Sequence, residues 1–264
     1  MGQKTSPTWA GSVKTLDQEE PLIPVDRSCR KGTPLPNRQY TRTSEFSYRC
    51  NGCGRCCRNK RIQTSPYEVL RLARNLELST GEFLIRYIDA EGPYLRAVEG
   101  GACVFLVNKG CGVHKDRPLA CRTYPLGLYV SPQGEETFLE LNPHPQTEGV
   151  YGCGGTVDQY LNQQGAQPYI DAGRRYMALF YRLHEALHQT MSPQADAAGE
   201  LQSAIAARDE GGLPAFTRWF DVDSMVAKYC KSLGIAVPVA TGELVKLHIQ
   251  SIEHVLDTNN GGER

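Results

Sequence analysis

The sequence lacks a long apolar run, an excess of charge of either sign and a secretory leader. No stretch of about 18 apolar residues could span a bilayer, and residues 1–20 have no apolar segment typical of a signal peptide. Lys plus Arg and Asp plus Glu both number 29, so the net charge creates no field that would attract nucleic acid or an anionic membrane. We therefore expect a cytoplasmic protein with no membrane span and no nucleic-acid partner.

Motifs for nucleotide binding are missing as well. The chain has no glycine-rich phosphate loop, and no Gly-x-Gly-x-x-Gly follows a predicted strand, so neither nucleotide nor dinucleotide binding is supported. Histidine is scarce, with 6 residues. The 264 residues, 40% of them hydrophobic, are nevertheless enough to fold around a substantial core.

Cysteine, in contrast, is plentiful, with 10 residues. We expect the two isolated ones, Cys29 and Cys230, to be small buried apolar residues. The others fall into two groups, which are Cys50, Cys53, Cys56 and Cys57, and then Cys103, Cys111, Cys121 and Cys153. Thiols in a reducing compartment are seldom paired as disulfides, so these groups predict metal ligation.

The spacing of the first group narrows the kind of centre. Thiolates are soft anionic ligands that suit zinc and iron–sulfur clusters. Cys50, Cys53 and Cys56 have the spacing of a bacterial ferredoxin, but Cys57 follows at once and Arg58 stands where that motif has proline. The run is therefore no ferredoxin signature. Adjacent cysteines are expected to point in different directions, which favours more than one simple site.

Local patterns predict an α+β fold in which a small, loop-rich cysteine module with short strands and helices precedes an α-helical C-terminal region. Ser65 and Ser79 each begin a capping box, which predicts two helices, and further helices are expected at 169–191, 222–233 and 243–256. Short strands are expected at 94–98, 103–107, 126–131 and 137–141.

These patterns divide the chain into three predicted segments. Residues 1–47 are polar and carry several prolines, which indicates an irregular N-terminal arm. Residues 48–192 form the predicted metal-binding domain with a packing helix, and residues 193–264 form the helical C-terminal region.

The chain resembles the YkgJ-like CxxCxxCC cysteine-cluster family over about residues 48–125. The resemblance rests on three stretches, namely Cys50-Asn-Gly-Cys53-Gly-Arg-Cys56-Cys57, Cys103-Val-Phe-Leu and Cys111-Gly-Val-His-Lys-Asp-Arg-Pro-Leu-Ala-Cys121-Arg-Thr-Tyr-Pro. It implies a domain that chelates zinc or iron; members are often named iron–sulfur oxidoreductases, and relatives include flagellin lysine N-methylases. The chain departs from the family at His114, where members often carry tyrosine, and at Cys153, which lies in Tyr-Gly-Cys-Gly-Gly.

We therefore expect the eight grouped cysteines to bind an iron–sulfur cluster, of the 4Fe-4S type, or zinc. Crowded cysteines with little histidine favour the cluster. A redox or binding protein and a protein-modifying enzyme, acting on a protein or peptide, both remain open, as do a structural zinc-binding interaction module and a flagellin N-methylase-like enzyme. The sequence identifies no catalytic residue.

A second motif, His184-Glu185-Ala186-Leu187-His188, matches the H-E-x-x-H of zinc peptidases on a predicted helix. Met191 and Gln194 replace the glycine and third histidine of the metzincin extension. We therefore interpret this segment as an ordinary amphipathic helix, with a metallopeptidase as the alternative.

Charged residues beside the second cysteine group are further candidates. Arg117, Arg122 and Tyr124 could stabilise thiolate charge or bind an anionic substrate group, or the two arginines could form ion pairs, for instance with Asp116. His114 could replace a thiolate ligand, although a lone histidine among cysteines more often lies outside the ligand shell.

Overall fold

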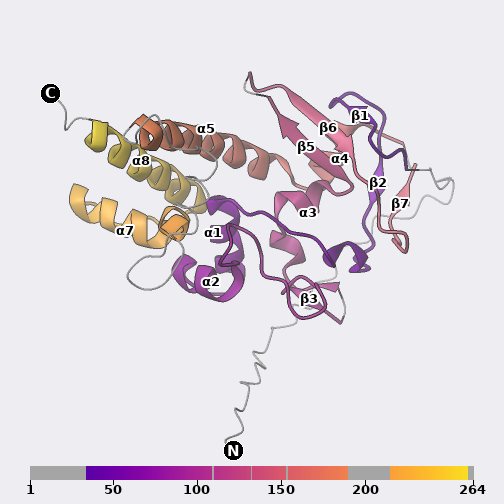
Figure 1. Cartoon of the computed structure of the whole chain (residues 1–264), viewed down its shortest axis with the longest axis horizontal. Helices are drawn as coiled ribbons and strands as arrows, with labels where there is room; N and C mark the ends of the chain where they lie inside the picture. Colours follow the sequence, from indigo (N-terminus) through magenta and orange to yellow (C-terminus); the bar gives the residue numbers. More distant parts are fainter. Residues whose placement is uncertain (1–33, 109, 132, 153, 190–214, 261–264) are drawn as a thin grey trace, which may run out of the picture.

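The computed structural model describes residues 34–108, 110–131, 133–152, 154–189 and 215–260. Long helices lie on one side of the molecule, short strands lie on the other, and two further helices, α1 and α2, lie between them (Figure 1). The predicted α+β class with a helical C-terminal region is thus confirmed. None of the helices in this part of the chain is long and apolar enough to cross a membrane.

The regular elements are short in the strand half and long in the helical half. The strands are β1 (Gln39–Tyr40), β2 (Tyr48–Arg49), β3 (Leu106–Val107), β4 (Gly110–Cys111), β5 (Leu126–Val130), β6 (Glu136–Glu140) and β7 (Val150–Tyr151). The α-helices are α1 (Pro66–Asn75), α2 (Thr80–Tyr87), α3 (Leu119–Thr123), α4 (Val157–Gln163), α5 (Gln167–Gln189), α7 (Val222–Leu233) and α8 (Thr241–Asn260). Single turns of 3-10 helix are η1 (Arg55–Cys57), η2 (His114–Asp116) and η3 (Ala215–Trp219).

The largest sheet has the order β1-β6-β5 and is antiparallel throughout. The predicted hairpin at 126–141 forms β5 and β6, in which Leu128 lies opposite Phe138. Tyr40 of β1 pairs with the same Phe138, so residues 34–47 of the segment predicted to be an irregular arm pack onto the sheet. The predicted strands at 94–98 and 103–107 are mostly wrong, because only Leu106–Val107 extends beyond isolated single-residue bridges.

Helix α1 connects the two halves because both of its faces are buried. It begins at the predicted capping box, in which the Ser65 hydroxyl accepts the Glu68 amide and the Glu68 carboxylate accepts the Ser65 amide. Leu70 packs into a cluster with α5, α7 and α8, while Leu72 packs into a second cluster with α2 and the loop before β3. Burial of such side chains contributes about 2 kcal/mol each, so α1 is a shared core element.

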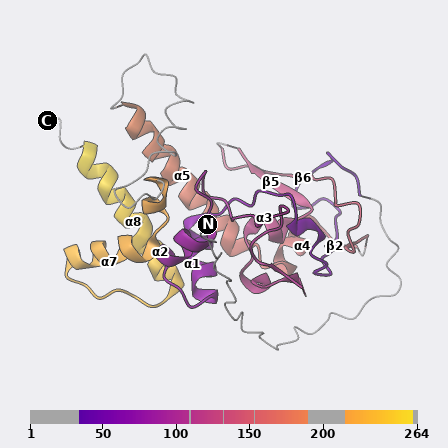
Figure 2. The same ribbon diagram turned by 60° about the horizontal axis from the view of Figure 1, so that its bottom comes forward.

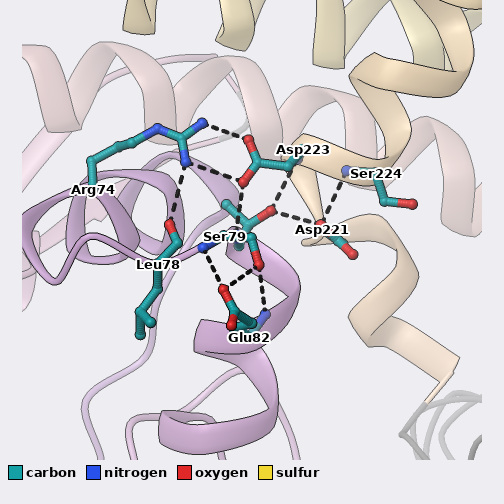
Figure 3. Close-up of polar contacts among 8 residues, drawn as sticks. Arg74, Leu78, Ser79, Glu82, Asp221, Asp223 and Ser224 are labelled. Carbon is teal, nitrogen blue, oxygen red and sulfur yellow. Dashed lines mark hydrogen bonds and ion pairs between the residues drawn. The ribbon is translucent and has the colours of Figure 1, made fainter.

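Polar contacts also join the helical half to α2 (Figure 3). The Thr80 hydroxyl donates to Asp221 Oδ1 at 2.6 Å, and the Thr80 amide donates to Asp223 Oδ2 at 2.8 Å. Arg74 at the end of α1 donates to the other oxygen of Asp223 at 2.6 Å. The start of α7 is therefore held against the start of α2, and Figure 2 shows these helices grouped away from the strands.

A buried histidine lies in the helical half. His248 of α8 is 0% exposed, and its Nδ1 lies 2.9 Å from the Tyr176 hydroxyl of α5. Its Nε2 has no hydrogen-bond partner in the described part of the chain. Burial lowers the pKa of His248 from 6.5 to about 3, so the folded protein keeps this imidazole neutral.

We expect this histidine to make the helical half sensitive to acid. Below pH of about 6.5 the unfolded chain binds a proton that the folded chain refuses until pH of about 3, so stability falls as the pH drops. The loss should approach about 1.4 kcal/mol for each pH unit in this window. Urea unfolding of the parent and of His248→Asn, measured between pH 7 and pH 5, tests this. Equal pH dependence in both proteins would contradict it.

Candidate metal centre

Most of the predicted ligands surround one cavity of about 70 Å³. The cysteines that line it are Cys50, Cys56, Cys57, Cys103, Cys111 and Cys121. They come from separate parts of the chain: the loop that ends in η1, the loop before β3, strand β4 and helix α3. Of the other two predicted ligands, Cys53 lies half-buried in the first loop outside this lining, and Cys153 falls outside the described residues.

Glycines let the first loop fold tightly against the others. Gly52 and Gly54 have φ of 63° and 70°, which side chains with a Cβ rarely adopt. A Cβ on Gly110 would lie 2.7 Å from the Gly52 carbonyl oxygen, so the β3–β4 turn approaches this loop at backbone distance. The Cys103 amide donates to the Cys57 carbonyl at 2.8 Å, which brings the two cysteine groups together.

Backbone amides donate to the sulfur of several cavity cysteines. In each case the donor is the second residue after the cysteine, and the pairs are Gly52 with Cys50, Phe105 with Cys103, and Val113 with Cys111. The Gly52 nitrogen lies 3.4 Å from the Cys50 sulfur. Burial raises the pKa of all three thiols, and the amide hydrogen bonds partly offset this. These loops therefore present donors that stabilise a thiolate or a metal-bound sulfur.

The adjacent cysteines Cys56 and Cys57 face the same cavity, contrary to the expectation that they would point in different directions. Their sulfurs share a hydrogen bond, which lowers the pKa of Cys56 to about 6 and raises that of Cys57 well above its usual value. One proton thus serves two sulfurs. This arrangement favours a single centre at this cavity.

Helix α3 brings Cys121 to the cavity and is held by a buried carboxylate. Glu68 of α1 accepts the Leu119 amide at the start of α3 with an oxygen-to-nitrogen distance of 2.6 Å. Cys121 lies one turn farther along, where burial raises the pKa of its thiol strongly and the neighbouring thiolates raise it further. A cation at the cavity would remove this repulsion.

The model of the CxxCxxCC family, described as "Putative zinc- or iron-chelating domain", matches residues 49–144. This part of the chain belongs to the CxxCxxCC family. An uncharacterized protein of Methanocaldococcus jannaschii is 29% identical over 142 residues, which cover 51% of this chain and 77% of that protein. No solved structure matches the chain. All the cavity cysteines lie inside the matched CxxCxxCC domain, whereas Cys153 lies beyond it.

Lys60 is a residue of the CxxCxxCC cavity that no sequence spacing indicated. Its ammonium nitrogen lies 4.2 Å from the centre of the Tyr124 ring, and both side chains line the cavity. Burial lowers the pKa of Lys60, while the thiolates of Cys56 and Cys121 act in the opposite direction. The Tyr124 hydroxyl accepts the His144 amide at 2.9 Å. Lys60 therefore supplies positive charge beside the sulfurs.

Arg117 makes His114 a poor candidate for a ligand. A guanidinium nitrogen of Arg117 lies 3.2 Å from His114 Nδ1. Arginine only donates, so this nitrogen must be the acceptor and Nε2 carries the proton in the neutral ring. Neither nitrogen then has a lone pair for metal, which agrees with the expectation that a lone histidine here lies outside the ligand shell.

The ion pairs near the CxxCxxCC site differ from the one considered in the sequence. Asp116 binds Arg71 of α1 at 2.5 Å and accepts the Asn75 amide at 2.9 Å. Arg117 and Arg122 instead donate to neutral acceptors, among them the side-chain and backbone oxygens of Gln164. The two arginines therefore keep their positive charge next to the cysteine cavity.

The remaining candidates lie away from this cavity. Cys230 is 1% exposed in the core between α7 and α8, as expected for a small apolar residue, while Cys29 falls outside the described residues. The H-E-x-x-H segment lies on α5, as its periodicity predicted. The side chains of His184, Glu185 and His188 fall outside the described residues, so their lack of a metal role stays a prediction.

Single-ion geometry is missing in the described part of the chain. No group of three His, Cys, Asp or Glu side chains there is arranged to hold one metal ion. The cavity sulfurs thus surround a common space without converging on a point. Either the thiolates draw together when a cation binds, or the ligand is larger than a single ion.

Proposed function

We propose that the CxxCxxCC domain holds an iron–sulfur cluster in the cysteine cavity and that the protein acts in electron transfer. The observation that carries this proposal is a common cavity lined by thiols from four segments, in which no three side chains of the described residues meet at one ion. Thiols without a carboxylate ligand among the lining residues are the donor set that iron–sulfur clusters require.

The spacing of sulfurs separates a cluster from zinc. Zinc binds thiolates at about 2.3 Å in a closed tetrahedron, so its four sulfurs lie within about 4 Å of each other. In a cluster each iron takes its own cysteine, and the cysteine sulfurs spread around a core of iron and sulfide. Sulfurs that line the walls of a cavity support the second arrangement.

The groups around the cavity suit a cofactor that carries negative charge. Amides of Gly52, Phe105 and Val113 donate to cysteine sulfurs, and Lys60 and Arg117 place positive charge along the wall. Such donors stabilise the reduced form of a cluster and so raise its reduction potential. A bound cluster would supply one-electron transfer, and a 4Fe-4S cluster would use four of the cavity cysteines.

The position of the cavity supports exchange of electrons with another molecule. Cys50 is exposed at its edge, while Cys121 lies at its inner wall on α3. A redox partner could therefore approach from the side of Cys50. The protein would hold and screen the cluster, and the partner would determine the pathway of the electron.

Anaerobic purification followed by metal and sulfide analysis tests the proposal. We expect iron and acid-labile sulfide at stoichiometric levels together with a broad brown absorption that bleaches on reduction. A colourless protein with one equivalent of zinc would overturn the cluster and leave a structural zinc-binding module. The double variant His184→Ala, His188→Ala is the matched control and should retain all of the metal; loss of one equivalent would reveal a second site on α5.

A further inference from the structure

A second cavity, of about 310 Å³, adjoins the cysteine cavity and is lined mainly by polar groups. Four cationic side chains line it, from Arg49, Lys115, Arg117 and Arg122. Gln163 and Gln164 at the end of α4 complete its polar wall, and no carboxylate is among the described residues that line it. We call it the basic cavity.

The positive charge of the basic cavity is not neutralised by the described part of the protein. None of its four cations forms an ion pair with a carboxylate there, and the nearby Asp116 is bound by Arg71. Arg122, 7% exposed, donates to the carbonyls of Arg117, Lys115 and Gln164 and to the Tyr169 hydroxyl. All of these acceptors are neutral.

Several donors of the basic cavity are held in place before any ligand arrives. Arg117 donates to the His114 carbonyl at 2.7 Å and to Gln164 Oε1 at 2.7 Å. Because that amide oxygen is occupied, Gln164 is left with its NH2 group for donation. Fixed donors lose little conformational entropy on binding, which favours affinity for an acceptor of matching charge.

We propose that the basic cavity binds a small phosphate-bearing ligand. A volume of about 310 Å³ suits a small molecule. With four cations and no lining carboxylate, a dianionic phosphate gains more from the site than a singly charged carboxylate, and planar guanidinium groups match phosphate oxygens. Both cavities share Cys50, His114 and Arg117, so the ligand would lie against the outer wall of the cysteine cavity.

The test is calorimetric titration of the full-length, anaerobically purified protein with inorganic phosphate at constant ionic strength. We expect saturable binding of one phosphate per chain. Lys115→Glu and Arg49→Glu should each weaken binding about tenfold or more, because each replaces an attraction by a repulsion. The matched control is Lys228→Glu, an exposed lysine of α7, which should leave the affinity unchanged.

Absence of saturable binding would overturn the inference, and so would equal weakening by Lys228→Glu or acetate binding as tight as phosphate. Titration with glycerol 3-phosphate separates two sources of the phosphate group: tighter binding than inorganic phosphate supports a phosphate ester, and weaker binding supports the free anion. The inference goes beyond the proposed cluster. Metal content is measured on the same samples, so a phosphate result and a metal result can fail independently.

Discussion

Removal of the metal is expected to abolish hydrogen-exchange protection across residues 50–63 and 101–121, while α5, α7 and α8 stay protected. The strands near the cavity are only two residues long, and the loops that carry the cysteines are joined by a few backbone hydrogen bonds. Metal ligation can contribute on the order of ten kcal/mol to such a site. The helical half has its own buried core, which the metal does not touch.

Electrostatics act in the same direction. The thiolate neighbours of Cys121 raise the pKa of its thiol, which means that the sulfurs repel one another once they lose their protons. A bound cation removes that repulsion, and its loss restores it. The emptied cavity should therefore open.

Exchange measured by mass spectrometry on metal-loaded and chelated protein, both kept anaerobic, checks this result. Peptides from α8 serve as the internal control, because Ile252 and Leu256 are buried among helices only. Unchanged protection of the two cysteine segments after complete removal of the metal would show that the fold of the domain does not depend on it.

Cys121→Ala is expected to remove most of the bound metal, whereas Cys230→Ala should leave the metal content unchanged. Cys121 lines the cavity, and its loss takes away a ligand that no neighbouring side chain in the described part can replace. Cys230 is buried between α7 and α8, so its truncation creates a small void that costs about 1 kcal/mol but touches no ligand. The two variants make the same chemical change in different surroundings.

Cys53→Ala separates the sequence prediction from the cavity. The spacing of the first group makes Cys53 a ligand, yet its side chain is not among those that line the cavity. We expect this variant to retain more metal than Cys121→Ala. Metal and sulfide content per chain are the measured quantities. Equal loss in the variants of Cys121 and Cys230 would mean that the cavity does not define the ligands.

The sequence by itself determined the elements that rest on local chemistry. The capping boxes at Ser65 and Ser79 place two helices, since the cap residues and their partners lie three positions apart. The hairpin at 126–141 and the helices of the C-terminal half follow from periodicity and turns. The grouping of cysteines likewise sufficed to indicate a metal-binding domain, because ligand spacing within a loop is a local property.

Other features were decided only by the tertiary structure, because they depend on residues that are far apart in the chain. Strand β1 forms only against β6, and β2 only against β7, which no local period indicates. Lys60 enters the cavity because the loop that carries it folds back toward Tyr124.

The basic cavity depends on the same long-range packing. Arg49, Lys115 and Gln164 meet there from three distant elements, and none of them is distinctive in sequence. The hydrogen bonds that orient Arg122 come from loop carbonyls on both sides of α3, whose positions follow from how α3 and α4 pack. Local propensity selects the helices and short turns, whereas burial and long-range hydrogen bonding decide which charged and sulfur-bearing side chains come together.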